Sequence, residues 1–249
     1  MNGYLIEAEN LSYVYPDGTR GISKVSFKVA PGEAVALVGE NGAGKSTLLQ
    51  HLSGCLFATG GVVSVAGLPV IKENLPAVRR AAGMIFQNPD DQLFMPTVFD
   101  DVAFGLLNLG VGEGELEAMV LKALETVGIA HLRARPPYRL SQGEKRAAAI
   151  AAVVALEPEV LVMDEPTSNL DPRARRRLMR LLKTFDHAKI IATHDLDFAL
   201  EICDRTIVIH EGTIAADGPT TEVFSKADLL ERCNLETPPS MRGCPNCAR

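Results

Sequence analysis

Residues 39–46 read Gly39-Glu-Asn-Gly-Ala-Gly-Lys45-Ser46, and this stretch decides the fold. It matches the pattern G-x-x-x-x-G-K-[ST], in which glycines let the backbone curl so that successive N–H groups point at phosphate oxygens. The apolar run 34–38 is expected to be a buried strand, and residues 45–53 to form a helix. A helix that begins at Lys45 adds its positive dipole end to the loop. This stretch, the phosphate loop, therefore predicts a nucleotide site between a strand and a helix.

Hydroxyl side chains follow the lysine of the phosphate loop. Lys45 is expected to bridge the β- and γ-phosphates, Ser46 to ligate Mg²⁺, and Thr47 to support it. An ordinary glycine-rich turn is the alternative, but it would need neither the strand before the loop nor the helix after it. The predicted nucleotide-binding positions here are Gly39, Glu40, Asn41, Gly42, Ala43, Gly44, Lys45, Ser46 and Thr47.

A second chemical signal is the apolar run 160–163, which ends in Asp164 and Glu165. The strand end is expected to place Asp164 near the Mg²⁺, acting through water. Glu165 is then free to orient or deprotonate an attacking water. Pro166 ends the strand. The alternative is a solvated carboxylate pair at a strand end, which the phosphate loop upstream disfavours.

The composition of the 249 residues is that of a folded globular protein, with 47% hydrophobic and 22% charged residues. Lys and Arg number 25 against 31 Asp and Glu, so the net charge is −6 and we expect no nucleic-acid partner. The basic run 173–177 is expected to be a solvated helix face. No run of about 18 apolar residues occurs, so any membrane role is expected to come through a partner.

Predicted strands and helices alternate along the chain, which is typical of an α/β protein with a parallel sheet. The character is helical from about 92 to 156, and this part is expected to be an insertion into the sheet domain. The expected strands are 5–14, 25–29, 34–38, 62–65, 83–86, 160–163, 189–193, 205–210 and 213–216, and the expected helices are 45–53, 115–127, 142–156 and 172–183.

Residues 140–144, Leu-Ser-Gln-Gly-Glu, form a third motif. Ser141 is a good N-cap, and Glu144 lies at capping-box spacing, so a helix is expected to begin here with a second anion site at its N-terminus. A mere capping box is the alternative. With the phosphate loop and the acidic strand, this motif makes the chain resemble an ABC ATPase over about residues 4–225.

The resemblance implies the fold of that family. It is an α/β P-loop NTPase fold with a mostly parallel core sheet, an N-terminal antiparallel β subdomain and an inserted α-helical subdomain. On this basis the ATPase domain is expected over residues 1–235, with the helical subdomain at about 92–156. Residues 236–249 are expected to be a flexible C-terminal tail. The implied cofactors are ATP and Mg²⁺.

The resemblance also assigns roles to single residues. Ser141, Gln142 and Gly143 are expected to face the γ-phosphate held by a second ATPase subunit, so one chain holds half of each site. Tyr15 stands where the family stacks an aromatic ring on adenine, although Tyr13 competes for that role.

Three further positions match the family pattern. Gln87 follows a predicted strand, and there the family contacts Mg²⁺ or the attacking water. Asp171 closes the motif 168–171 and, before Pro172, is also a good N-cap; Asn169 in this motif replaces the Ala or Gly often found. His194 follows a strand and is expected to bond the γ-phosphate. The catalytic set is thus Glu165, His194 and Gln87, and the metal set Ser46, Gln87 and Asp164.

Segments 87–94 and 97–105 resemble the energy-coupling-factor importers, which take up cobalt, nickel or vitamins. Segments 193–199 and 209–212 favour the cobalt and nickel branch. The implied partners are a second ATPase subunit (identical or not), a transmembrane scaffold protein and a membrane substrate-binding component. The implied location is the cytoplasmic face of the membrane. The scaffold is expected in a groove near Gln87, with Leu93, Phe94, Met95 and Phe99 as its floor or, alternatively, as core.

Other functions stay open at this point. One is an ABC ATPase that does not transport, although such groups carry long coiled-coil insertions or tandem cassettes. Another is a nucleotide-binding regulatory module without hydrolysis, which Glu165 and His194 argue against. In the tail, Cys244 and Cys247 are either two ligands of a metal site or part of a mobile segment.

Overall fold

The computed structural model describes residues 3–242. Its smaller sheet is antiparallel and has the strand order β2 (Arg20–Val29), β1 (Ile6–Val14), β4 (Gly60–Val65), β5 (Leu68–Pro69). Ile6 lies opposite Val29 on one side and Val65 on the other. All three side chains are fully buried. This face of the sheet therefore packs into the interior, as the expected N-terminal β subdomain requires.

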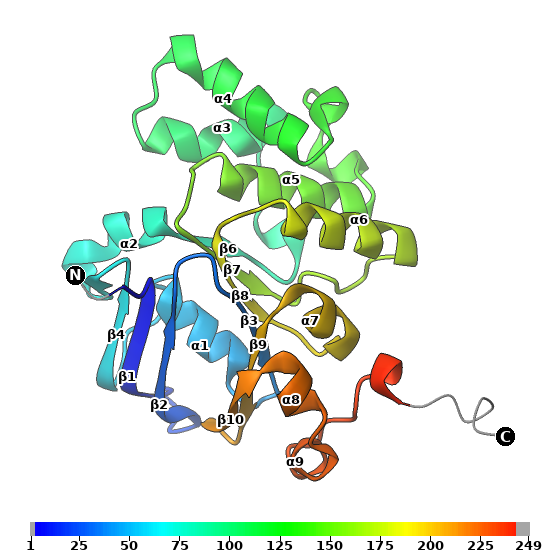
Figure 1. Ribbon diagram of the computed structural model, residues 1–249. Helices are drawn as coiled ribbons and strands as arrows, with labels where there is room; N and C mark the ends of the chain where they lie inside the picture. The colour runs from blue at the N-terminus through cyan, green and yellow to red at the C-terminus, as the bar shows by residue number, and fades with distance from the viewer. Residues whose placement is uncertain (1–2, 243–249) are drawn as a thin grey trace, which may run out of the picture.

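The larger sheet has six strands and forms the centre of the molecule (Figure 1). Its order is β10 (Thr213–Pro219), β9 (Arg205–His210), β3 (Ala34–Val38), β8 (Ala188–Ala192), β7 (Val160–Asp164), β6 (Ala82–Ile85). All neighbouring pairs are parallel except β10 with β9. The carboxyl ends of β3, β8 and β7 consequently meet at one edge, which is where ligands bind in open parallel sheets. The expected fold class is confirmed.

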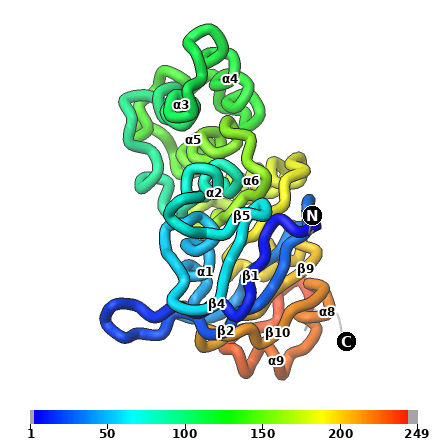
Figure 2. The backbone as a smooth tube through the Cα atoms, turned by 90° about the vertical axis from the view of Figure 1, so that its left-hand side faces the viewer, coloured from blue at the N-terminus to red at the C-terminus, as the bar shows by residue number. Residues whose placement is uncertain are grey.

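Helices cover both faces of this sheet, and α3, α4 and α5 gather at one end of the molecule (Figure 2). No helix in residues 3–242 is long and apolar enough to cross a membrane. The helices are α1 (Lys45–Leu52), α2 (Leu75–Ala81), α3 (Val98–Asn108), α4 (Glu113–Thr126), α5 (Gln142–Val154), α6 (Pro172–Lys183), α7 (Leu196–Ile202), α8 (Thr220–Phe224) and α9 (Ala227–Arg232).

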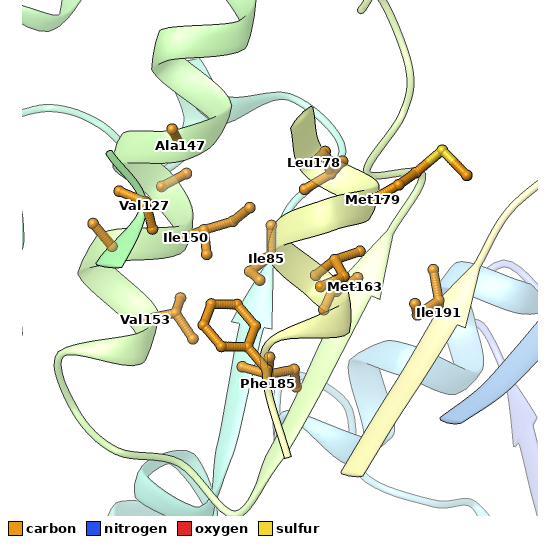
Figure 3. Close-up of a cluster of buried hydrophobic side chains, with 14 of the residues drawn as sticks. Ile85, Val127, Ala147, Ile150, Val153, Met163, Leu178, Met179, Phe185 and Ile191 are labelled. Atoms are coloured by element: carbon orange, nitrogen blue, oxygen red, sulfur yellow. The ribbon is translucent and has the colours of Figure 1, made fainter. Parts of the chain in front are cut away.

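The parallel sheet separates two hydrophobic cores, because side chains alternate along each strand. In β3, Val35 and Leu37 face the core that contains α1 and the antiparallel sheet. Ala36 and Val38 face the second core, with α3 to α7. Figure 3 shows part of that second core, where Ile150 of α5 lies close to side chains of β6, β7 and α6. The central strands are therefore apolar on both faces.

The bounds expected from the sequence agree closely with the structure for β3, α6 and β9. Strand β2 begins at Arg20, five residues before the expected start at Val25, because its pairing with β1 continues across register shifts. The short helices α2 and α7 were not expected. Each is only seven residues long, too short for a clear apolar period.

Candidate nucleotide site

A cleft of about 1010 Å³ opens at the edge where β3, β7 and β8 end. It collects most of the predicted site residues from segments far apart in the sequence. Ala43 does not line it: this side chain is buried behind the loop, in the core beneath the antiparallel sheet. The predicted residues that line the cleft are Tyr15, Gly39, Glu40, Asn41, Gly42, Gly44, Lys45, Ser46, Thr47, Gln87, Asp164, Glu165 and His194.

The phosphate loop fits closely against the chain around it at two of its glycines. A Cβ at Gly39 would lie 2.3 Å from the carbonyl oxygen of Ile209. Gly44, the residue before α1, has φ +108°, and a Cβ there would lie 2.6 Å from the carbonyl oxygen of Gly21. Both positions therefore require glycine, one for space and one for conformation as well.

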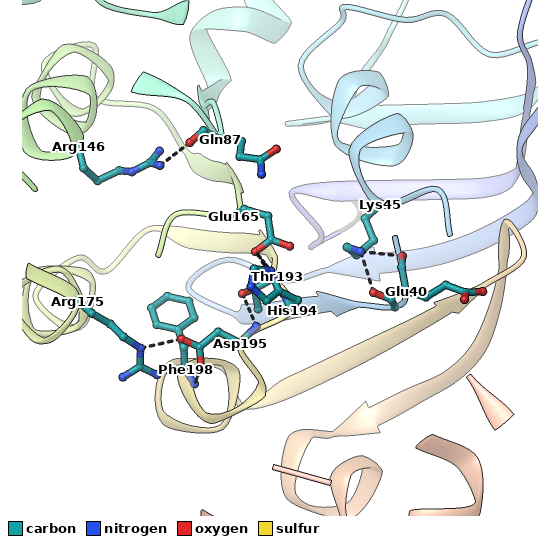
Figure 4. A network of polar contacts seen from close by, with 11 residues as sticks. Glu40, Lys45, Gln87, Arg146, Glu165, Arg175, Thr193, His194, Asp195 and Phe198 are labelled. Atoms are coloured by element: carbon teal, nitrogen blue, oxygen red, sulfur yellow. Dashed lines mark hydrogen bonds and ion pairs between the residues drawn. The ribbon is translucent and has the colours of Figure 1, made fainter. Parts of the chain in front are cut away.

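Lys45 is the cation of the loop and is only 7% exposed. Its Nζ donates to the carbonyl oxygens of Gly39 (2.8 Å) and Glu40 (3.0 Å), as Figure 4 shows. Burial lowers the pKa of Lys45, and the nearby carboxylates of Glu165 and Asp164 act against that shift. The ammonium group is thus held inside the loop, where it would contact a bound phosphate.

Oxygen donors suited to Mg²⁺ lie beside the loop. Burial raises the pKa of Asp164, while the Ser46 hydroxyl and the charge of Lys45 oppose the rise. Ser46, Asp164 and the amide of Gln87 all line the cleft. Residues 3–242 hold no cluster of three His, Cys, Asp or Glu that could bind a metal by itself. This donor set fits Mg²⁺, which takes one or two protein ligands together with the phosphates of its nucleotide.

Glu165 and His194 form a direct pair. His194 Nδ1 lies 2.7 Å from Glu165 Oε2, and the His194 backbone N–H also donates to that oxygen at 3.3 Å. Glu165 has φ +44°, a left-handed conformation that a non-glycine residue rarely adopts. The His194 side chain is 66% exposed, whereas that of Glu165 is buried. The pair places a carboxylate and an imidazole together in the wall of the cleft.

The structure distinguishes the two tyrosines that compete for the adenine. Tyr15 lines the cleft, and Tyr13 does not. The Tyr15 hydroxyl lies 2.8 Å from the Thr47 hydroxyl, at the end of the phosphate loop. Tyr15 is therefore the aromatic ring within reach of a bound base.

The Ser141 motif lies elsewhere. Ser141, Gly143 and Asp171 line a separate hollow of about 250 Å³ between α5 and α6, and Gln142 begins α5. The predicted capping box is present, with Ser141 N–H donating to Glu144 at 2.8 Å and Glu144 N–H to the Ser141 hydroxyl at 3.4 Å. Asp171 caps α6 as predicted, accepting from two backbone N–H groups at 2.8 and 2.9 Å. One chain thus leaves this helix end outside the cleft.

Residues 22–168 match the family of ABC transporters. The chain belongs to this family. It is 57% identical to a Geobacter sulfurreducens protein that is named as an ABC transporter ATP-binding protein. The alignment covers the whole of both chains. It is 44% identical to the energy-coupling factor transporter ATP-binding protein EcfA of Methanocaldococcus jannaschii, over 94% of this chain and 86% of that protein.

A solved structure supports the same family assignment. The chain matches CbiO1 of Clostridium perfringens, part of the ABC transporter complex CbiONQ, with a TM-score of 0.83 and 37% identity. The match covers 94% of this chain and 95% of that one. As an ABC ATPase of energy-coupling-factor type, the chain binds ATP, and its hydrolysis powers transport. It is an ATP-driven transporter subunit.

This ABC ATPase contains a buried arginine that the sequence did not single out. Arg146 of α5 is 2% exposed, and one of its Nη atoms donates to the carbonyl oxygen of Phe86 at 2.5 Å. The other donates to the carbonyl oxygen of Gln87, also at 2.5 Å (Figure 4). Burial lowers its pKa to about 10, so it stays charged at neutral pH. Arg146 therefore ties the Ser141 helix to the loop that carries Gln87. The available signal was a basic pair, Lys145 and Arg146, directly before the alanine-rich part of α5.

A second arginine fixes the segment after His194. Arg175 of α6 donates to both carboxylate oxygens of Asp195, at 2.7 and 3.0 Å. Asp195 also caps α7 by accepting from Phe198 N–H at 2.9 Å. The pair joins α6, which starts at Asp171, to the loop of His194.

The last described residues also line the cleft. Asn234 Nδ2 donates to Glu40 Oε2 at 2.7 Å, and the Ser240 backbone N–H donates to Asp197 at 3.1 Å. Residues 236–242 belong to the tail expected to be flexible; here several of them form part of the cleft wall. No sequence signal pointed to this contact. Cys244 and Cys247 lie outside the described residues.

The four residues expected as groove floor or core differ from one another. Leu93 is buried in the core, and Phe99 packs against it. Phe94 is 64% exposed, and its ring meets that of Phe104 edge-on, with centroids 5.1 Å apart. Met95 is half-buried. The core alternative therefore holds for Leu93, and Phe94 presents an aromatic surface.

Proposed function

We propose that this chain is the ATPase subunit of an energy-coupling-factor importer of cobalt or nickel ions, peripheral on the cytoplasmic face of the membrane. Its ATPase domain spans residues 1–235, with the helical subdomain at about 92–156 and a tail at 236–249. Segments 193–199 and 209–212 favour the metal-ion branch. An importer of a vitamin or another small molecule is the alternative, because a separate membrane component selects the substrate in this family.

One observation carries the chemistry: Lys45, Gln87, Asp164, Glu165 and His194 converge on one cleft. Glu165 positions the attacking water and accepts its proton, since its buried carboxylate opens onto the cleft. His194 bonds the γ-phosphate, and the Lys45 ammonium neutralises charge that develops on the phosphates. Gln87 contacts the water or the metal.

Ser46, Gln87 and Asp164 would hold the Mg²⁺, with Asp164 acting through water. When bound, this ion supplies charge neutralisation at the phosphate oxygens. Gly39, Glu40, Asn41, Gly42, Ala43, Gly44 and Thr47 complete the phosphate-binding segment, and Tyr15 stacks on the adenine.

The site is completed by a second ATPase subunit. Ser141, Gln142, Gly143 and Asp171 lie away from the cleft of their own chain, which supports a role toward the nucleotide of the other subunit. The backbone N–H groups at the start of α5 supply the anion site. Closure of two subunits on two ATP molecules then draws the helical subdomains together.

The scaffold protein docks beside Gln87. Phe94 and Phe104 form an exposed aromatic pair next to that loop, which suits an apolar helix from the scaffold. Arg146 would pass movement of the scaffold to the Ser141 helix through the Gln87 loop. No nucleic acid is involved.

The test is to purify the tagged chain from native membranes in mild detergent and to identify its partners by mass spectrometry. We expect a small transmembrane scaffold and a membrane substrate-binding protein that binds cobalt or nickel. A vitamin-binding component would overturn the metal assignment alone. Two large permease subunits, nucleic acid, or no membrane partner would overturn the importer assignment and leave the ATPase.

A further inference from the structure

We propose that His51 is a positioning residue, which holds Tyr15 in place for the nucleotide base through contacts with Tyr13 and Thr47. The proposal rests on the proposed function in one respect, the stacking of Tyr15 on adenine. It adds a residue that lies wholly outside the cleft and touches no part of the nucleotide.

His51 lies on α1, the helix that Lys45 begins, and its side chain is 0% exposed. Its Nδ1 lies 2.7 Å from the carbonyl oxygen of Thr47. A carbonyl only accepts, so Nδ1 carries the proton and donates. Burial lowers the pKa of His51, so the ring is neutral at pH 7. Nε2 then carries a lone pair, and this buried nitrogen has no hydrogen-bond partner among the residues that the structure describes.

The ring of His51 also supports a tyrosine pair. It meets the Tyr13 ring edge-on with centroids 5.0 Å apart, and Tyr13 meets Tyr15 in the same way at 4.9 Å. The Tyr15 hydroxyl in turn contacts the hydroxyl of Thr47, which belongs to α1, at 2.8 Å. Tyr13, Tyr15, Thr47 and His51 thus form a closed ring of contacts, which we name the tyrosine–histidine cluster.

Thr47 is held at both ends by this cluster. Its hydroxyl meets Tyr15, and its carbonyl accepts from His51. Gly21 closes the cluster from the other strand: a Cβ there would lie 2.9 Å from Thr47 Cγ2 and 3.0 Å from Tyr15 Cε2. The Tyr15 ring is therefore confined on several sides, although it stands just past the exposed end of β1.

This confinement has a consequence for binding. A free tyrosine at a hairpin would lose rotamer freedom each time a base stacked on it. A ring already held in place avoids that cost, which is the general advantage of preorganisation. Because Thr47 and His51 belong to α1, the same helix fixes the position of the Tyr15 ring and of the phosphate loop.

The test compares two ligands, Mg-ATP and Mg-tripolyphosphate, which share phosphates but differ in the base. With His51→Leu, calorimetry is expected to show a Kd for Mg-ATP raised about threefold to tenfold, a fraction of what base stacking contributes. The Kd for Mg-tripolyphosphate is expected to stay unchanged. His51→Asn keeps an N–H donor near the Nδ1 position and is expected to restore part of the ATP affinity.

Two further variants separate the causes. Leu49→Ala removes a buried side chain from the same helix outside the cluster, and is expected to lower the unfolding temperature without changing either Kd. An equal loss of affinity for both ligands in His51→Leu, or no loss for ATP, would overturn the positioning role. Tyr15→Ala tests the stacking itself: an unchanged ATP Kd there would overturn the base role and the positioning role together. A weaker ATP Kd in Tyr15→Ala with none in His51→Leu would overturn the positioning role alone.

Discussion

The phosphate loop and the Ser141 motif both stand at the start of a helix, yet the two helix ends are built differently. The loop is fixed by its own backbone, with Gly39 and Gly44 packed against neighbouring carbonyls and Lys45 bonded within the loop. The Ser141 helix end has its capping box and opens to a separate hollow of about 250 Å³. The phosphate loop thus lies inside the cleft of its own chain, and the Ser141 helix end lies outside it.

Two arginines are among the contacts that link these two sites. Arg146 bonds the Gln87 loop from α5, and Arg175 bonds Asp195 from α6. Movement of the helical part relative to the sheet would therefore reach the cleft through two buried or half-buried arginines. The contrast between the cleft and the Ser141 helix end can be tested by changing residues of each in turn.

The largest effect is expected in the cleft, from Glu165→Gln. The amide cannot accept the proton of the attacking water, so hydrolysis is expected to fall about 100-fold or more while ATP binding is retained. Steady-state phosphate release and nucleotide binding are the measurements. Glu159→Gln, at the exposed start of the same strand, is the control. Hydrolysis close to the wild-type rate in Glu165→Gln would contradict the assignment.

The next effect concerns the need for a second molecule. Lys45→Ala and Ser141→Arg are each expected to abolish hydrolysis, one by losing the phosphate cation and the other by blocking the helix end. When the two variants are mixed and allowed to exchange subunits, dimers that contain one copy of each variant have one intact site. Such dimers are expected to restore up to about a quarter of the activity. If the mixture stays inactive, Ser141 does not complete the site of an identical partner.

Arg146→Met is expected to loosen the link. It leaves the carbonyls of Phe86 and Gln87 without their donors, a cost of about 1–3 kcal/mol in the free energy of unfolding. Hydrolysis is expected to fall about tenfold, because a small displacement of a catalytic loop is costly. Urea unfolding and phosphate release measure the two effects. Arg176→Met, an exposed arginine on α6, serves as the control; a loss of the same size there would contradict the role of Arg146.

The smallest effect is on pH dependence. Burial lowers the pKa of His51 below 6.5, so below that pH the unfolded chain binds a proton that the folded chain does not. The free energy of unfolding is therefore expected to fall between pH 7.5 and 5.5, in part because of this residue. His51→Leu should show a shallower slope in urea unfolding. His187, whose pKa burial also lowers, accounts for part of the remaining slope.

The residues predictable from the sequence are those fixed by local chain geometry. The phosphate loop, the strand ending at Asp164 and the caps at Ser141 and Asp171 each depend on spacings of a few residues, and the structure has them where the spacing requires. The phosphate loop and Asp164 come together because a parallel sheet gathers strand ends at one edge, whereas Ser141 and Asp171 line a separate hollow.

Contacts across the fold were beyond such reasoning. Arg146 meets its carbonyl partners 59 and 60 residues away, and no local pattern joins them. Tyr13 and Tyr15 are only two residues apart, at the end of β1 and just after it, so the local pattern alone did not separate them. The structure separates them, because Tyr15 lines the cleft and Tyr13 does not. The contact of Asn234 with Glu40 spans 194 residues and had no signal.

The left-handed backbone of Glu165 bears on how this protein can be engineered. A glycine would adopt φ +44° without strain, and asparagine would adopt it more easily than glutamate does. A screen that selects only for thermal stability would therefore favour replacing this glutamate and would yield variants that are more stable but inactive. Any stabilised version must be selected with turnover as a second criterion, because at this position the side chain proposed for catalysis adopts a backbone conformation that glutamate rarely takes.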